Sequence, residues 1–528
     1  MNSQDIYEMV RSLQKRGVNH AVISPGSRNF PIIQALVSTS DMALHEVIDE
    51  RSAGYHAIGL SIATDQPTII TCTSGTAALN YYPAIAEAFY AEVPLIVLTA
   101  DRPPEAIDNW EGQSVRQKNV FASHTMKSFH IDPGTSVSEL QNKAEEAYRL
   151  SIQKAGPVHI NIAFREPFYD GIEISKNSTR SHLPWDKSGM DDTQQLLRFL
   201  PEDGKLLWLN GHDRSAGPYV QTENVLQLSD VLSNKMQTIN HWEAVLPTKK
   251  QCVPSVIITT GTYFVSKQLR NWLKQNKELV HVHLGSREVL PTPFGTNPIQ
   301  LNLDYQEAIQ LVDRSLTDSY RSIWEELGFE ESYEKISADH HTEIKLMEAL
   351  YEKLPSNSHL HLANSTTVRN AALLRRRFDI RHLGNRGTSG IDGCTSTAVG
   401  YASATDEQVF LFTGDLAFLY DINGLWRTNL PQNLKIVVFN NFGGGIFELI
   451  DGPDNYPETL KWQVTAHNKS VADLTKAMGV ETFKITAESD KEIIDNFFDY
   501  DGCAVLEIET SRDENKSYLN DLKRALRR

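Results

Sequence analysis

The sequence predicts an α/β protein with three doubly wound parallel-sheet domains. Two features carry this prediction: short runs of almost continuously apolar residues, typical of strands buried on both faces, and longer helical patterns between them. Parallel strands cannot be joined by a tight turn, so each pair needs a helical crossover of this kind. A third feature is the length of 528 residues, which exceeds what one hydrophobic core usually organises.

The first domain is expected over residues 1–175. It begins with a helix at about Gln4–Lys15, in which Ile6, Val10 and Leu13 recur at helical spacing. β-rich runs follow, and the first two end in Pro-Gly and Ser-Gly turns. Strands are therefore predicted at 20–24, 67–72 and 94–99.

Two further stretches divide the rest of the chain. Residues 171–193 are polar and lack clear periodicity, and an acidic helical segment lies around 324–337. We interpret both as linkers, which gives a central domain over 190–330 and a third domain over 340–528. The strands of these domains are predicted at 205–209, 255–260 and 279–284, and at 359–363, 409–413, 434–440 and 503–508.

Composition and charge exclude several classes of partner. The net charge of −16 argues against binding to nucleic acid or to an anionic membrane, because both need dense Lys and Arg. Residues Met1–Asp5 are not basic, and no run of about 18 apolar residues occurs, so we expect a cytoplasmic protein. Cys72, Cys252, Cys394 and Cys503 form no CxxC pair and are expected to be packing residues.

A carboxylate and a carboxamide follow two neighbouring predicted strands of the third domain. Gly414-Asp415-Leu416 ends one strand, and Asn440-Asn441 ends the next. Ligands bind at this edge of an open parallel sheet, and such oxygen atoms suit Mg²⁺, which shares its coordination with phosphate. In the alternative interpretation, Asp415 caps the following helix, and the asparagines form a turn with Gly443 to Gly445.

The segment Asp49 to Gly54 leads from a strand into a helix of small residues. Glu50 is expected in the first turn of this helix, where the helix dipole stabilises an ionised acid, and that role alone explains it. The functional alternative is a buried acid that hydrogen-bonds a cofactor nitrogen and changes its proton affinity.

Two turns and several cations complete the candidate residues. Ser24–Arg28 and Thr73–Thr76 each lie between a strand and a helix, where backbone N–H groups can approach a ligand, although such turns also need glycine for conformational reasons. Arginine forks pair with carboxylates, but a single one is more often part of a surface ion pair. The candidate cations are Arg28, Arg102, Arg369 and Arg386.

Together these segments resemble the thiamine-diphosphate enzyme superfamily. Within it they are most similar to the family of 2-succinyl-5-enolpyruvyl-6-hydroxy-3-cyclohexene-1-carboxylate synthases of menaquinone biosynthesis. The resemblance spans nearly the whole chain and follows the family's order. It rests on Ser24–Arg28, Asp49–Gly54, Thr73–Ala77, Leu98–Pro104, Asn385–Gly393, Gly414–Leu416 and Asn440–Phe447.

The resemblance implies a pyrimidine-binding first domain, a central domain without cofactor, and a third domain that binds diphosphate and Mg²⁺ or Mn²⁺. Glu50 is then the acid that activates the aminopyrimidine ring, and Ile391 supports the bent cofactor. Asp415, Asn441 and the Gly443 carbonyl are the implied metal ligands. The further implied cofactor contacts are Thr73, Ser74, Gly75, Ser389, Gly390, Gly414, Leu416, Ile446 and Phe447.

The activity implied by the resemblance is that of a transferase. It decarboxylates 2-oxoglutarate and adds the succinyl carbanion to isochorismate. Both substrates are dicarboxylates, which would explain the cations. The implied substrate residues are Ser27, Arg28, Arg102, Gln113, Lys267, Ser365, Arg369 and Arg386; of these Arg28, Gln113, Ser365 and Arg369, with Glu50, are the implied catalytic residues.

The family places its site between two subunits, so a homodimer or a dimer of dimers is expected. Three positions depart from the family's pattern: Gly112 replaces a common Asn, Gln268 a usual Arg and Gly445 a frequent Gln. These departures leave the acceptor preference open. The alternatives are another thiamine-diphosphate carboligase or 2-oxo acid decarboxylase with a different acceptor, such as one resembling acetohydroxyacid synthase, and an inactive cofactor-binding partner.

Overall fold

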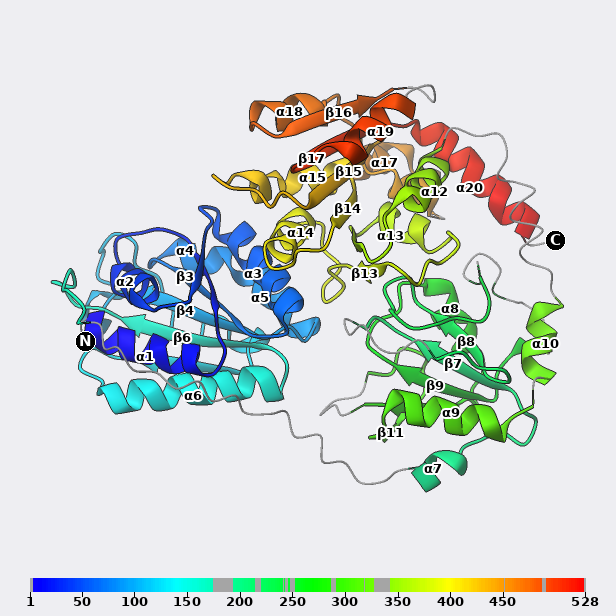
Figure 1. Ribbon diagram of the computed structural model, residues 1–528, viewed down its shortest axis with the longest axis horizontal. Coiled ribbons are helices and arrows are strands. Elements are labelled where there is room, and N and C mark those ends of the chain that lie inside the picture. Colours follow the sequence, from blue (N-terminus) through cyan, green and yellow to red (C-terminus); the bar gives the residue numbers. More distant parts are fainter. Residues whose placement is uncertain are drawn as a thin grey trace.

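The computed structural model contains three parallel sheets, each formed by one region of the chain (Figure 1). The structure describes residues 3–173, 193–213, 220–240, 242, 246, 252–285, 291–317, 319–326, 342–450, 452–486 and 491–526. The predicted linkers lie largely outside these residues. The α/β class and the parallel sheets predicted from the sequence are confirmed.

The N-terminal sheet has the strand order β2-β1-β3-β4-β6-β5. Successive side chains of its central strands enter opposite cores: Ile69 packs with α1, α2 and α6, whereas Ile70 packs with α3, α4 and α5. The elements are α1 (Ser3–Lys15), β1 (His20–Ile23), α2 (Phe30–Ser38), β2 (Ala43–Glu46), α3 (Glu50–Thr64), β3 (Thr68–Cys72), α4 (Thr76–Asn80), α5 (Tyr82–Tyr90), β4 (Leu95–Asp101), β5 (Lys127–Ile131), α6 (Val137–Gln153) and β6 (Pro157–Ala163).

The C-terminal sheet has the equivalent order, β13-β12-β14-β15-β17-β16. Helices α12, α13, α19 and α20 cover one face, and α14, α15 and α18 cover the other. The elements are α12 (Glu343–Lys353), β12 (His359–Leu362), α13 (Thr366–Ala371), β13 (Arg381–Leu383), α14 (Cys394–Ala402), β14 (Val409–Gly414), α15 (Asp415–Tyr420), the 3₁₀ helix η5 (Ile422–Leu425), β15 (Leu434–Asn440), α16 (Ile446–Leu449), α17 (Pro457–Val464), α18 (Val471–Ala477), β16 (Glu481–Ile485), α19 (Lys491–Asp499), β17 (Ala504–Glu509) and α20 (Arg512–Leu526).

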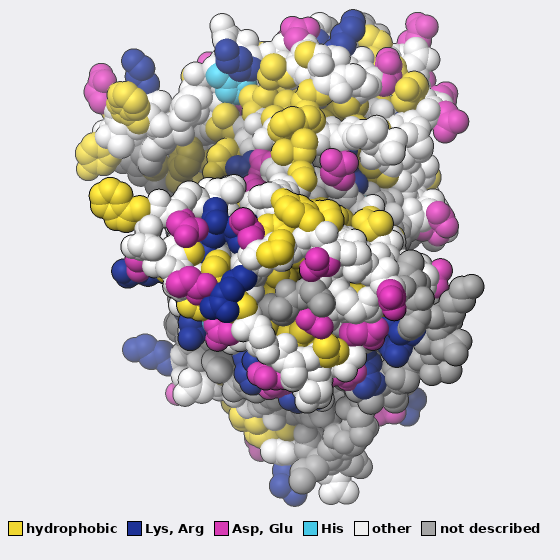
Figure 2. Space-filling model, turned by 90° about the vertical axis from the view of Figure 1, so that its left-hand side faces the viewer, with side chains coloured by type: hydrophobic (Ala, Val, Ile, Leu, Met, Phe, Trp, Pro, Cys, Tyr) yellow, Lys and Arg dark blue, Asp and Glu magenta, His cyan; other side chains and the backbone are white. Residues whose placement is uncertain are grey.

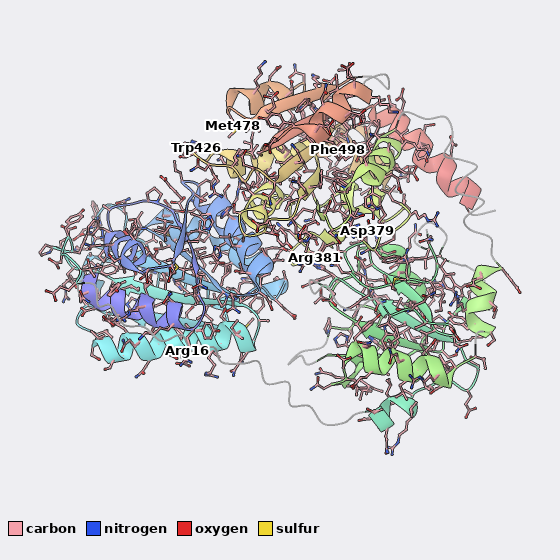
Figure 3. All side chains as sticks on the ribbon, viewed as in Figure 1. Arg16, Asp379, Arg381, Trp426, Met478 and Phe498 are labelled. Atoms are coloured by element: carbon pink, nitrogen blue, oxygen red, sulfur yellow. The ribbon has the colours of Figure 1, made fainter. Side chains whose placement is uncertain are left out.

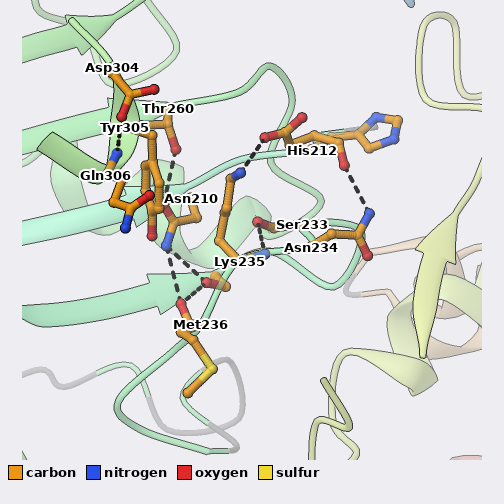
Figure 4. Close-up of polar contacts among 12 residues, drawn as sticks. Asn210, His212, Ser233, Asn234, Lys235, Met236, Thr260, Asp304, Tyr305 and Gln306 are labelled. Atoms are coloured by element: carbon orange, nitrogen blue, oxygen red, sulfur yellow. Dashed lines mark hydrogen bonds and ion pairs between the residues drawn. The ribbon is translucent and has the colours of Figure 1, made fainter. Parts of the chain in front are cut away.

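The central sheet, β11-β10-β9-β7-β8, carries a polar network at the carboxyl ends of its strands (Figure 4). The Asn210 amide donates to Ser229 Oγ at 3.1 Å and to the Met236 carbonyl at 3.2 Å, and it accepts from Thr260 Oγ1 at 3.0 Å. Groups of the central domain thus provide the hydrogen-bond partners at this edge of the sheet. The elements are α7 (Thr193–Leu197), β7 (Leu206–Asn210), β8 (Leu226–Ser229), β9 (Val256–Thr260), α8 (Lys267–Leu273), β10 (Val280–Leu284), β11 (Ile299–Leu301), α9 (Tyr305–Ser315) and α10 (Ser319–Glu325).

The predicted strands are confirmed to within one or two residues, but the edge strands and the inner strand β6 were missed. β2 exposes most of its side chains and β13 has only three residues, so neither gives an apolar run. The assignment of Trp324 to the second linker was wrong: it belongs to α10 and is fully buried in the central core. The four cysteines are buried and unbonded to one another, as expected.

Helices α3 and α14 join the N-terminal domain to the C-terminal domain through a close crossing at two glycines. A Cβ atom at Gly59 would lie 2.1 Å from the Thr397 carbonyl oxygen, and one at Gly400 would lie 2.0 Å from that of His56. The backbones can approach this far only because both positions lack a side chain. Polar contacts flank the crossing: Tyr55 donates to Asp392 at 3.0 Å.

We expect Gly400→Ala to weaken this crossing, because a methyl group there meets backbone rather than a side chain that can move. An overpacked position of this kind costs about 2 kcal/mol. The thermal unfolding midpoint, measured by calorimetry, should therefore fall by about 5 °C. Gly171→Ala is the matched control, since a Cβ atom at that position meets nothing within 4 Å. Equal midpoints for the two variants would contradict the close crossing.

Candidate functional site

Most of the sequence-predicted site residues lie at the carboxyl ends of strands in the two outer sheets. In the N-terminal domain, Ser27 and Arg28 follow β1, Thr73 to Gly75 follow β3, and Arg102 follows β4. Glu50 begins α3 after β2. Because parallel strands end at one edge, four separate loops converge there.

The loops of the N-terminal domain touch one another directly. A Cβ atom at Gly26 would lie 2.4 Å from Thr73 Cβ, and the Arg28 backbone N–H donates to Thr73 Oγ1 at 3.3 Å. Gly75, at φ +93°, lies so close to Gln113 that a Cβ atom would be 3.2 Å from Gln113 Cα. The structure thus brings Gln113, which is distant in sequence, to the turn after β3.

Glu50 has an environment that separates it from an ordinary helix-capping acid. Asp49 provides the N-cap by accepting from the backbone N–H groups of Arg51 and Ser52. The Glu50 carboxylate is therefore not needed as the cap; it accepts from Asn80 Nδ2 at 3.4 Å. Burial raises the pKa of Glu50 above its ordinary value, so this carboxyl holds a proton more readily than an exposed one.

The two candidate cations of the N-terminal domain, Arg28 and Arg102, pair with carboxylates close to solvent. Arg28 Nη2 lies 2.9 Å from Glu166, whose side chain is 67 % exposed. Arg102 Nη1 lies 3.1 Å from Glu111, and Nη2 donates to the Gly112 carbonyl at 2.7 Å. A carboxylate ligand can replace such exposed partners without leaving a buried charge unpaired.

In the C-terminal domain, the Asn364 side chain fastens the loops that follow β12 and β13. Its amide group donates to the carbonyls of Asn385 and Gly390 at 2.6 and 2.7 Å, and its oxygen accepts from Arg386 at 2.7 Å. Arg369 donates to the Ser365 carbonyl at 2.5 Å. Burial lowers the pKa of Arg386 most, the charge of Asp230 raises it, and the charge of Arg369 lowers it. Neighbouring guanidinium groups of this kind favour an anionic ligand.

The proposed metal ligands meet between the ends of β14 and β15. Asp415 Oδ2 accepts from the Gly443 backbone N–H at 2.7 Å and lies 2.8 Å from His467 Nε2. The Lys469 backbone N–H donates to His467 Nδ1, so Nε2 carries the hydrogen that points at Asp415. The Asn441 amide nitrogen lies 3.5 Å from Glu343. No group of three or more His, Cys, Asp or Glu side chains able to hold a metal occurs within the described residues.

Four of the predicted site residues have a buried polar atom without a hydrogen-bond partner. These atoms are Ser74 Oγ, Arg102 Nε, Arg386 Nε and Asn441 Oδ1. Unpaired buried atoms also occur elsewhere, for example at Trp272 and Thr395, so each one alone is weak. These four atoms belong to residues of the predicted site and are free to bond a ligand. Asn441 Oδ1 in particular fits an oxygen ligand for Mg²⁺ beside Asp415.

The remaining predicted residues surround these groups. Ile391 packs with Ala363, Cys394 and Ala417. Ser389 has a left-handed backbone at φ +63°. Ile446 and Phe447 are half-buried in α16, and Gly414 and Leu416 flank Asp415.

Lys267 is the predicted residue that fits least, because it lies exposed at the start of α8 in the central domain. Arg270, one turn later, is the residue of α8 whose charge reaches Arg386. Of the three departures from the expected pattern, Gln268 is exposed, Gly112 has open space around it and a Cβ atom at Gly445 would touch the Asn441 amide.

Sequence reasoning missed several residues that support the site. Asn364, Glu343 and His467 bond predicted site residues, and the charge of Arg270 lowers the pKa of Arg386. Asn364 directly precedes Ser365 at a strand end, which was an available signal. Arg270 lies three residues after Lys267, which was also an available signal, whereas Glu343 and His467 lie far from the motifs in sequence and gave none.

The residues form two half-sites within one chain. Glu50 bonds Asn80 within the N-terminal domain, whereas Asp415 bonds Gly443 and His467 within the C-terminal domain. No hydrogen bond or ion pair links Glu50 to Asp415 in the described part of the chain. The contact between domains runs instead beside them, where Asn423 donates to Asp49 at 2.8 Å.

Two equivalent sheets with converging polar loops, an acid of raised pKa on one and an oxygen-lined turn on the other, define a thiamine-diphosphate-binding enzyme. The family profile for the thiamine pyrophosphate enzyme N-terminal TPP binding domain matches residues 7–124, and that for the C-terminal TPP binding domain matches residues 367–508. Within this class, the chain belongs to the family of 2-succinyl-5-enolpyruvyl-6-hydroxy-3-cyclohexene-1-carboxylate synthases.

The relatives that show this membership are similar over almost their whole length. The synthase of Cytophaga hutchinsonii is 34 % identical, with 99 % of both chains covered. That of Flavobacterium psychrophilum is 33 % identical over 93 % of this chain and 94 % of its own. That of Bacteroides thetaiotaomicron is 32 % identical, with 90 % of each chain covered.

Proposed function

We propose that this chain decarboxylates 2-oxoglutarate and adds the resulting succinyl unit to isochorismate, giving 2-succinyl-5-enolpyruvyl-6-hydroxy-3-cyclohexene-1-carboxylate in menaquinone biosynthesis. The names of its relatives support this activity. The single observation that carries it is that Arg369 and the buried Arg386, whose Nε has no partner, follow the neighbouring strands β12 and β13. Two cations at one edge of the sheet suit a dicarboxylate better than a monocarboxylate such as pyruvate.

Thiamine diphosphate supplies the carbanion chemistry when it is bound. Glu50 holds a proton against the aminopyrimidine, a task for which its raised pKa suits it. Ser74 Oγ and the turn that ends at Gly75 provide polar contacts on the same domain. Ile391, packed against Ala417, provides an apolar support on the other.

Asp415, the Asn441 side chain and the Gly443 carbonyl hold the divalent metal, Mg²⁺ or Mn²⁺. The unpaired Asn441 Oδ1 supports this assignment. His467 and the Gly443 N–H both bond one oxygen of Asp415, which orients the carboxylate. Neutralising the diphosphate is the main task of the metal.

The substrate carboxylates are held by the arginines of both half-sites, with Ser27, Gln113 and Ser365 as polar neighbours. Gln113 and Ser365 have left-handed backbones, at φ +55° and +77°, a strain that clusters at functional positions. Lys267 is retained as a substrate contact only by the resemblance, and Arg270 is the better-placed cation of α8.

A second candidate function is carboligation with another acceptor. The specific observation in its favour is the open space at Gly112, where the family commonly carries a polar side chain. The donor half of the reaction is the same in both proposals, because it depends on Arg369 and Arg386. Only the acceptor distinguishes them.

We place the protein in the cytoplasm as a homodimer or dimer of dimers whose sites lie between subunits. None of the helices in the described residues is long and apolar enough to cross a bilayer. Apolar side chains form a strip in the upper middle of the view in Figure 2, with charged side chains beside and below it. Trp426, 54 % exposed, lies at the edge of the C-terminal domain toward the N-terminal domain (Figure 3). Exposed Leu44 and Ile48 line the same hollow as Trp426, and Tyr420 in α15 is exposed as well. A second copy would cover such a surface.

The activity is tested by incubating the protein with thiamine diphosphate, Mg²⁺ and 2-oxoglutarate, with and without isochorismate. Mass spectrometry should detect the succinyl adduct only when isochorismate is present. Replacing 2-oxoglutarate by pyruvate should lower kcat/KM by about tenfold to hundredfold, because the second carboxylate is lost. Carbon dioxide release without any isochorismate adduct would favour the second candidate.

Asp415→Ala should weaken thiamine-diphosphate binding in the presence of Mg²⁺ by about hundredfold or more, since the diphosphate loses its neutralising ion. Calorimetric titration measures this directly and needs no turnover. Asp406→Ala, which removes an exposed carboxylate of the same domain, is the control and should bind normally. Normal binding by the Asp415 variant would rule out the metal assignment.

Coexpression of Glu50→Ala and Asp415→Ala chains tests the site between subunits. If each site takes Glu50 from one chain and Asp415 from the other, one site of the mixed dimer carries both changes and the other carries neither. Activity should return to about half that of the wild type. The packing of α3 on α14 within one chain also allows a site completed by a single subunit. In that case both sites keep one defect, and the purified, cofactor-loaded mixed dimer stays inactive.

A further inference from the structure

A buried carboxylate of the N-terminal domain holds the loop that carries Arg386. Glu87, in α5, is 1 % exposed. It accepts from the backbone N–H groups of Gly387 and Thr388 at 2.7 and 2.6 Å, and from Thr388 Oγ1 at 2.7 Å. The loop belongs to the C-terminal domain, so these three bonds cross between domains.

The two backbone N–H donors, one at each carboxylate oxygen, favour an ionised carboxylate at Glu87. All three contacts are donors, and they use both carboxylate oxygens. Burial raises the pKa of this acid, while the Thr388 and Gly387 donors and the charge of Arg386 lower it. Arg386 is itself 9 % exposed, so Glu87 also offsets a buried positive charge.

Sterics fix the same loop against α5. A Cβ atom at Gly387 would lie 2.4 Å from the Glu87 carbonyl oxygen and 2.8 Å from the Ala91 nitrogen. On its other side, the loop is bonded by Asn364 through the carbonyls of Asn385 and Gly390. The segment that presents Arg386 is therefore held by one side chain of its own domain and by one of the other domain.

We propose that Glu87 is a positioning residue that fixes Arg386 for recognition of the donor substrate's distal carboxylate, and so makes donor binding depend on the contact between the two domains. This role rests on the proposed function of Arg386. The Glu87 side chain is buried where α5 meets the loop. It therefore acts through Arg386 rather than by touching the substrate.

Hydrogen–deuterium exchange of the ligand-free full chain tests, without any turnover, whether Glu87 holds the loop that carries Arg386. In Glu87→Gln an amide NH₂ faces donors that need an acceptor, so the peptide with Gly387 and Thr388 should exchange about tenfold faster. Asp313→Asn is the matched control, because Asp313 also accepts three backbone N–H groups, from Glu223, Asn224 and Val225 of the central domain. It should leave the Arg386 loop unchanged. Unaltered exchange in Glu87→Gln would show that Glu87 does not hold this loop.

Kinetics separate positioning from simple anchoring. With saturating thiamine diphosphate and Mg²⁺, Glu87→Gln should raise the KM for 2-oxoglutarate about tenfold with a much smaller change in kcat. Thr388→Val removes a single donor and should give a smaller rise. Arg386→Ala serves as the reference for complete loss of the contact.

The outcomes distinguish the two proposals. Faster exchange with an unchanged KM in Glu87→Gln, while Arg386→Ala raises KM, would overturn the positioning role and leave the proposed function intact. If Arg386→Ala leaves KM unchanged, the substrate role of Arg386 is wrong and the positioning role fails with it. A rise of KM in both variants, with faster exchange in the first, supports the inference.

Discussion

The crossing of α3 and α14 is the contact on which the rest of the structure depends. Gly59 and Gly400 let two helices from different domains meet at backbone distance. Each helix begins at a strand end that carries site residues, Glu50 in one case and the loop up to Gly393 in the other. The site residues at the start of each helix are therefore held relative to one another by the crossing. Glu87 and Tyr55 then fix the loop beside it.

The fold could be predicted from the sequence where a buried strand is mainly a continuous apolar run. Strand β6 is fully buried but was missed, because His159 and Asn161 alternate with its apolar residues. Strands such as Leu434–Asn440 are buried on both faces, and their apolar runs gave their bounds almost to the residue. Edge strands such as β2 and β13 were missed, because exposed or very short strands lack such a run. Trp324 was assigned to the linker because the residues around it are acidic and form a helical pattern, although its own ring is fully buried.

The candidate site was predictable where motifs end strands, and unpredictable where it depends on distant partners. Asp415, Asn441 and Ser74 followed from their place after strands. The contacts of His467, Glu343 and Glu87 could not be predicted, since they join segments far apart in sequence. Backbone strain at Gln113, Ser365 and Ser389 could not be predicted from the sequence either, because the surrounding fold imposes positive φ angles on residues other than glycine.

The two outer domains share their strand order, and their crossing is reciprocal. Gly59 abuts Thr397, which precedes Gly400 by three positions, and Gly400 abuts His56, which precedes Gly59 by three positions. A contact of this form is isologous, the kind that relates two copies of one protein in a symmetric dimer. One chain therefore contains its own twofold-like pair. Its two halves keep the same frame but have opposite chemical characters: an acid that titrates begins one helix, and an apolar side chain, Ile391, stands before the other.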